Sequence, residues 1–194
     1  MPRPLIVLVA FVAALALGAC GSSASSKSST GTAAVTTTSP QLFSSKTYEK
    51  AKPDPSISAK MICQKEARVD IASSLGVAAT RLTTPTWNRS QHMYACTYVY
   101  PNGKIALSVK EMSSAGETTA YFDGVMKKYG AVQPLIGLGQ GAWVLKNSDV
   151  VVRKDYKVLV VDVQAVPKQF QPLMKSSDAA INIAVAIMGC WSGA

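Results

Sequence analysis

The chain contains a single histidine, His92, and only 11 acidic residues among 194. A Ser-His-Asp or Cys-His arrangement would have to use His92, and no GxSxG turn that could present a nucleophile occurs. There is no CxxC pair, and the spacing of the carboxylates places no two of them together on one predicted element. The sequence therefore predicts no catalytic residue, no metal site and no cofactor, and it indicates a protein that is not an enzyme. His92 is expected to lie exposed at the edge of a strand.

Long apolar runs are also scarce. The charge-free run over residues 5–19 is shorter than the about 20 residues that a membrane helix requires. Arg3 precedes this run and the small residues Gly18 and Ala19 close it, which is the organisation of a secretory signal peptide. We therefore interpret residues 1–19 as a signal peptide and expect the remaining chain to be exported.

A cysteine, Cys20, follows the apolar run directly, and a Ser-rich segment follows the cysteine. The sequence LGAC at residues 17–20 resembles the lipobox of bacterial lipoproteins. That resemblance implies that the Cys20 sulfur takes up a diacylglycerol and that the signal peptide is cut before this residue. Two or three acyl chains anchor a protein firmly, whereas one chain alone is marginal. We expect a lipid-anchored protein on the extracytoplasmic face of the cell membrane.

The charge of the chain is strongly positive. Its formal net charge is +9, and removal of Arg3 with the signal peptide leaves 19 basic and 11 acidic residues, a net charge of +8. Such a balance favours contact with anionic lipid head groups or anionic wall polymers, although it also suits an ordinary solvated surface. Nucleic-acid binding is not expected, because the chain is exported and its basic residues form no dense run.

The composition divides the chain into a tether and one domain. Residues 21–45 are a low-complexity segment of Ser, Thr and Ala, which cannot bury enough apolar surface to fold. We interpret residues 20–57 as the lipidated cysteine with a disordered tether, and residues 58–194 as a single folded domain, with a size that allows a real core.

Within the domain, the pattern predicts a helix from an N-cap at Ser58 to a C-cap at Gly76, and strands over residues 92–100 and 104–112 joined by a turn at Asn102-Gly103. A second helix is expected to begin with a capping box of Ser114 and Glu117. Three strands over 142–146, 149–155 and 157–166 and a final apolar helix over 176–191 complete the elements. The glycine-rich residues 137–141 precede a strand pattern rather than a helix, so they indicate a tight turn and not a phosphate loop.

This order of elements predicts an α+β fold. Short turns between the strands favour antiparallel pairing. We expect a mainly antiparallel sheet of about five strands, with the helices packed mostly on one face.

Three cysteines remain besides Cys20, and an exported domain can oxidise them. We predict a disulfide between Cys63 and Cys96, which would join the first helix to the first strand. The pairings of Cys63 or Cys96 with Cys190 are the alternatives, because the final helix is also expected to pack on the sheet. In the preferred pairing, Cys190 is either a buried filler or a thiol for an intermolecular bridge.

Several segments together resemble small actinobacterial, mycobacterial-type cell-envelope lipoproteins with a domain of unknown function. They are the lipobox, the Ser/Thr tether, ICQKEARVDIASSLG, YACTYVY, GLGQGAWV and KVLVVDVQ. The resemblance covers residues 58–190 and implies an α+β domain with a concave sheet, a helix cysteine bonded to a strand cysteine, and a role in the cell envelope.

Two functions follow as hypotheses. The first is a non-catalytic surface lipoprotein that binds an envelope protein, a wall polymer or a lipid near the membrane. The second is a carrier or sensor of an apolar small molecule in a cavity between helix and sheet, lined by the final helix and by Tyr121, Phe122 and Met126. The same three side chains would otherwise be ordinary core residues.

Overall fold

The computed structural model describes residues 48–192, and Cys20 with the signal peptide and most of the predicted tether lies outside this range. The helices are α1 (Ile57–Met61), α2 (Lys65–Leu75), α3 (Ala115–Tyr129) and α4 (Ser176–Ser192). The strands are β1 (Arg81–Leu82), β2 (Thr86–Asn88), β3 (Met93–Tyr100), β4 (Gly103–Glu111), β5 (Ala131–Pro134), β6 (Gly141–Leu145), β7 (Val150–Lys154), β8 (Lys157–Ala165), β9 (Gln169–Gln171) and β10 (Met174–Lys175). The predicted α+β class is confirmed.

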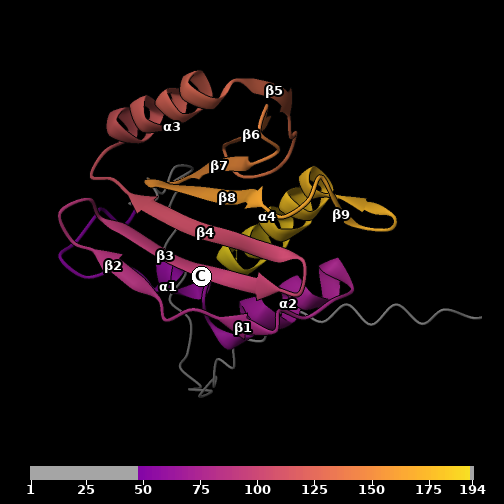
Figure 1. The fold of residues 1–194 in the computed structure, drawn as a ribbon. Helices are drawn as coiled ribbons and strands as arrows, with labels where there is room; N and C mark the ends of the chain where they lie inside the picture. The colour runs from indigo at the N-terminus through magenta and orange to yellow at the C-terminus, as the bar shows by residue number, and fades with distance from the viewer. Residues whose placement is uncertain (1–47, 193–194) are drawn as a thin grey trace, which may run out of the picture. The chain divides into compact units, whose positions relative to one another are not determined.

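The main sheet has eight strands in the order β1-β3-β4-β8-β7-β6-β5, with β2 also paired to β3, and every pairing is antiparallel (Figure 1). The prediction of about five strands was too low. The strands β1 and β2 have two and three residues, which is too short to produce an alternating pattern. The edge strand β5 ends at Pro134, which is tolerated there because an edge strand does not need every N–H.

Helices cover both faces of this sheet, three on one side and one on the other (Figure 1). Side chains alternate accordingly along β7: Val150 and Val152 belong to the larger buried cluster with α2 and α4, whereas Val151 belongs to a smaller cluster with α3. The helices therefore lie mostly on one face, as predicted.

The ends of α3 follow the predicted capping chemistry. The Ser114 hydroxyl accepts from the Glu117 backbone N–H at 3.2 Å, and the Glu117 carboxylate accepts from the Ser113 N–H at 2.8 Å. At the other end, Gly130 adopts a φ of +74° and its N–H donates to Met126. Residues close to each end of α3 are therefore sufficient to determine where the helix begins and ends.

The first predicted helix is instead two helices, and its N-cap is Ser56 rather than Ser58. The Ser56 hydroxyl accepts from the Ala59 N–H at 3.1 Å, and its own N–H faces the buried Glu111 carboxylate at 3.4 Å. Glu111 lies at the end of β4, so this cap depends on a contact with a residue distant in the sequence. The chain leaves the helical path around Cys63, between α1 and α2.

Residues just before α1, which the sequence analysis grouped with the tether, pack on the domain. The Ala51 N–H donates to the Met112 carbonyl at 2.9 Å, and the Trp87 indole N–H donates to the Pro53 carbonyl at 2.8 Å. The packed part of the chain therefore begins before residue 58. Among residues 48–192, no helix has both the length and the apolar character needed to cross a membrane.

Candidate functional site

His92 lies in the turn just before β3 and has a backbone φ of +48°. Its ring is half-buried and lies 6.0 Å from the Trp87 ring. The prediction of an exposed histidine is wrong, because the side chain packs against Trp87 and is partly buried. Across residues 48–192 the imidazole makes no hydrogen bond to a serine, cysteine or carboxylate, and no three His, Cys, Asp or Glu side chains in that range gather to hold a metal ion.

The predicted disulfide between Cys63 and Cys96 is confirmed, with the two Cα atoms 6.1 Å apart. It joins the segment between α1 and α2 to the middle of β3. Cys190 is buried in α4, and its thiol donates to the Asp70 carboxylate of α2 at 3.2 Å. Cys190 therefore contributes to the packing of α4 against α2, and its burial disfavours the intermolecular bridge.

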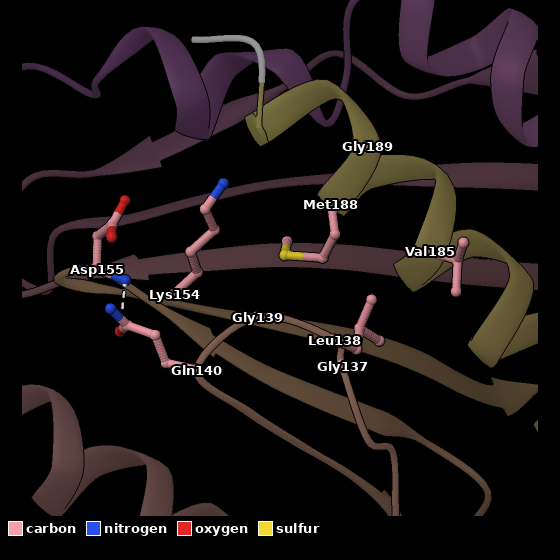
Figure 2. A pocket seen from close by; sticks show the side chains of 9 residues that line it. All are labelled: Gly137, Leu138, Gly139, Gln140, Lys154, Asp155, Val185, Met188 and Gly189. Carbon is pink, nitrogen blue, oxygen red and sulfur yellow. Dashed lines mark hydrogen bonds between the residues drawn. The ribbon is translucent and has the colours of Figure 1, made fainter.

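The glycine-rich segment leads into the strand β6, as predicted for a turn, and it forms one side of a cavity of about 480 Å³ that we call the loop cavity (Figure 2). The facing sides come from the β7–β8 turn and the C-terminal half of α4. Its lining residues are Gly137, Leu138, Gly139, Gln140, Lys154, Asp155, Val185, Met188 and Gly189.

Hydrogen bonds to β7 hold this glycine-rich segment in place. The Gln140 N–H donates to the Arg153 carbonyl at 2.8 Å, and the Gln140 side-chain oxygen accepts from the Asp155 N–H at 2.9 Å (Figure 2). A Cβ atom at Gly139 would lie 2.6 Å from the Arg153 carbonyl oxygen. Glycine is needed here for close packing of the loop on β7, which is a structural role.

A second cavity, of about 370 Å³, lies between α2 and β3, and we call it the α2 cavity. Alanine and valine side chains make its apolar wall, two tyrosine rings of β3 close it, and two cations of α2 complete it. The lining residues are Lys65, Arg68, Val69, Ala72, Ala78, Ala79, Tyr98 and Tyr100.

A third cavity, of about 470 Å³, also has Tyr100 in its wall, and we call it the β9 cavity. It lies between the end of α2, the β3–β4 turn and β9. Its lining residues are Gly76, Val77, Tyr100, Pro101, Asn102, Phe170, Gln171 and Pro172. Tyr100 therefore lies in the wall of both the α2 and the β9 cavity.

The hydroxyl of Tyr100 is buried and has no hydrogen-bond partner within residues 48–192, and burial raises its pKa to about 12. Its neighbour Tyr98 is also buried but is satisfied, because its hydroxyl donates to the Ile62 carbonyl at 2.7 Å. A buried hydroxyl without a partner costs about 1–3 kcal/mol. Such a group is uncommon in a folded protein, and an ordered water or a polar atom of another molecule would stabilise it.

The two cations of the α2 cavity make no ion pair with a carboxylate among the described residues. Lys65 and Arg68 lie three positions apart on α2, so their side chains project from the same side of the helix. The nearby Asp70 instead lies against α4, where it accepts from Cys190. The α2 cavity therefore combines an apolar wall with uncompensated positive charge.

Asp149, which the sequence analysis did not single out, is the most perturbed carboxyl group. It is buried at the start of β7 and accepts from the Val163 N–H at 2.9 Å, from the Asn147 amide at 2.6 Å and from the Gln164 amide at 3.2 Å. Burial raises its pKa from 3.8 to about 6, and the nearby Asp162 contributes, although the hydrogen bonds act in the opposite direction. Asp149 closes the β6–β7 turn and fixes β8 beside it.

The raised pKa predicts a pH-dependent stability. Below pH 4 the protonated group contributes its full stabilisation, and the stabilisation is lost as the pH rises through about 6, where the folded protein must ionise a buried acid. The loss amounts to at most about 3 kcal/mol. Urea unfolding between pH 4 and 7 should show this decrease in the wild type and in Asp123→Asn, an exposed control, but not in Asp149→Asn. Equal profiles for Asp149→Asn and the wild type would contradict the assignment.

No family model, curated protein or solved structure matches the chain.

Proposed function

We propose that this protein is a non-catalytic binding protein of the cell envelope, anchored to the membrane through lipid on Cys20, that takes up an anionic amphiphile at Tyr100. The observation that supports this ligand most directly is the α2 cavity, where, within residues 48–192, the buried Tyr100 hydroxyl has no hydrogen-bond partner and Lys65 and Arg68 form no ion pair.

The chemistry of the α2 cavity matches the two parts of such a molecule. An acyl chain gains about 0.8 kcal/mol for each methylene that it buries, and Val69, Ala72 and Ala79 offer an apolar surface. A carboxylate or phosphate head would accept charge-assisted hydrogen bonds from Arg68 and Lys65. The volume of about 370 Å³ lies in the range of small-molecule sites.

Binding can be measured by titration calorimetry with laurate, and with dodecanol as an uncharged probe of the same chain length. We expect laurate to bind more tightly than dodecanol, and Arg68→Ala to weaken laurate binding about tenfold, since a hydrogen bond to a charged group contributes about 1.5 kcal/mol. Lys127→Ala removes an exposed cation on α3 and serves as the matched control. If Arg68→Ala and Lys127→Ala bind laurate equally well, the head-group assignment is wrong.

Tyr100→Phe separates a binding role from a structural one. Removing an unpartnered buried hydroxyl should raise the free energy of unfolding of the ligand-free protein by about 1 kcal/mol. The same change should weaken laurate binding, because the ligand loses a hydrogen-bond donor. Tyr98→Phe is the control with the opposite sign, since it removes a satisfied hydroxyl and should destabilise the protein. A Tyr100→Phe protein that is less stable than the wild type would contradict this account.

A second candidate, a docking site for an envelope protein or wall component, is favoured by the loop cavity. Apolar side chains are exposed beside it: Ile136 is 92% exposed and Val185 is 53% exposed. A photo-reactive amino acid at position 136 in intact cells should capture a discrete partner that the same probe at exposed Asp123 does not. Identical cross-linking patterns from the two positions would remove this candidate.

A further inference from the structure

The β9–β10 hairpin presents an apolar side chain to solvent at its tip. Leu173 is 100% exposed and lies with Pro172 between the two paired strands. Figure 1 shows this hairpin projecting away from the main sheet beside α4. A fully exposed leucine at a projecting tip is available for contact with another surface.

The hairpin is held firmly at its base. Phe170 is buried, and its ring lies edge-on to Tyr100 with the ring centroids 5.3 Å apart. The Asn102 amide donates to the Phe170 carbonyl at 2.6 Å, and the Gln171 amide donates to the Leu75 carbonyl at 2.9 Å. These contacts fix the direction in which Leu173 points, so its exposure is a feature of the fold.

The charge at the base of the hairpin is positive. Lys168 and Lys175 are exposed there, where Lys175 pairs with Gln169, and no acidic residue occurs between Asp162 and Asp178. Asp178 itself accepts from the Lys175 backbone N–H at 3.1 Å, as expected at the start of α4. An apolar tip with two cations behind it is complementary to the surface of an anionic bilayer, where the leucine enters the hydrocarbon boundary and the lysines meet the head groups.

We infer that the β9–β10 hairpin is a membrane-contact element that inserts Leu173 into a bilayer containing anionic lipids. This contact is additional to the lipid anchor on Cys20 and does not depend on the proposed cavity ligand. Pro172 and Gln171 also line the β9 cavity, so the contact places that cavity next to the lipid head groups.

The test is flotation of the mature chain carrying Cys20→Ser, which has no lipid of its own, with vesicles. One set of vesicles mixes phosphatidylglycerol with phosphatidylcholine, and the other contains phosphatidylcholine alone. We expect the chain to bind the anionic vesicles and to bind the neutral vesicles more weakly. Raised ionic strength should weaken the binding to the anionic vesicles. Leu173→Asp should lower the partition coefficient at least tenfold, since it removes the inserted apolar side chain.

Ile57→Asp is the matched control, because Ile57 is an exposed apolar residue on α1 and the change in charge is the same. This variant should bind vesicles within about twofold of the parent chain, because only one of many charges is altered. Thermal unfolding checks that both variants remain folded. The affinity of Leu173→Asp for laurate should equal that of the parent chain, and this measurement separates the membrane contact from the proposed cavity ligand. Failure of the parent chain to bind anionic vesicles, or equal binding by the two variants, would overturn the inference.

Discussion

Replacing both Cys63 and Cys96 with alanine should lower the free energy of unfolding by roughly 3–4 kcal/mol. The disulfide closes a loop with a sequence separation of 33, and the lost restraint on the unfolded chain accounts for an effect of about this size. It also joins the α1–α2 segment to β3, so its loss should release the wall of the α2 cavity. Urea unfolding monitored by circular dichroism measures the change.

Reduction of the wild-type protein supplies the control for this prediction. A reducing agent should destabilise the wild type by about as much as the double substitution does, and it should leave the double variant unaffected. A wild-type unfolding midpoint that does not move on reduction would show that the disulfide does not stabilise the domain.

Gly103→Ala should destabilise the protein by about 3 kcal/mol, since it combines backbone strain with overpacking. Gly103 begins β4 with a φ of +152°, and a Cβ atom there would collide with the Ala165 carbonyl oxygen and with Val166. Ala165 pairs with Lys104 next to the irregularity between β4 and β8, so an alanine at position 103 would force the backbone at the end of β8 to move.

Gly124→Ala is the matched control for Gly103→Ala. Gly124 is exposed within α3 and an added Cβ atom would meet nothing within 4 Å, so alanine there should stabilise the helix by about 0.5–1 kcal/mol. Thermal unfolding of the two variants should therefore show shifts of opposite sign. Shifts of equal size and the same sign would mean that the close approach of β4 to β8 is not the cause.

Predictions that depended on local chemistry agree with the structure. The capping box of Ser114 and Glu117 and the β3–β4 hairpin involve residues within a few positions of one another. The hairpin turn itself is one residue earlier than expected, because Pro101 and Asn102 occupy it and Gly103 already pairs with Tyr100. The disulfide between Cys63 and Cys96 was the preferred one of three possible pairings, and only the fold excludes the two that involve Cys190.

Features that depend on distant partners could not be predicted. Ser56 caps α1, and its own N–H donates to Glu111, which lies 55 positions later. The short strands β1 and β2 form by pairing with β3. The cavity site was missed for the same reason. Of the α3 stripe that the sequence analysis considered as a cavity lining, Phe122 is buried against the sheet with Leu145 and Val151, and Tyr121 and Met126 pack beside it partly buried.

The residues of the cavity site have no sequence signature of their own. Tyr98 and Tyr100 occupy equivalent positions in an alternating strand. Only the fold determines that the Tyr98 hydroxyl donates to the Ile62 carbonyl while the Tyr100 hydroxyl has no hydrogen-bond partner within residues 48–192. Lys65 and Arg68 look like ordinary exposed helix residues, and their lack of carboxylate partners becomes evident only once the surroundings of α2 are known.

The lipid on Cys20 is the central claim, because it determines where the cavities and the hairpin act. The most direct measurement is metabolic labelling with a palmitate analogue, together with membrane fractionation, for the wild type and Cys20→Ser. We predict that the wild type is labelled and found with membranes, and that Cys20→Ser is unlabelled and shifts to the soluble fraction. An unlabelled wild type whose membrane association survives Cys20→Ser would contradict the account.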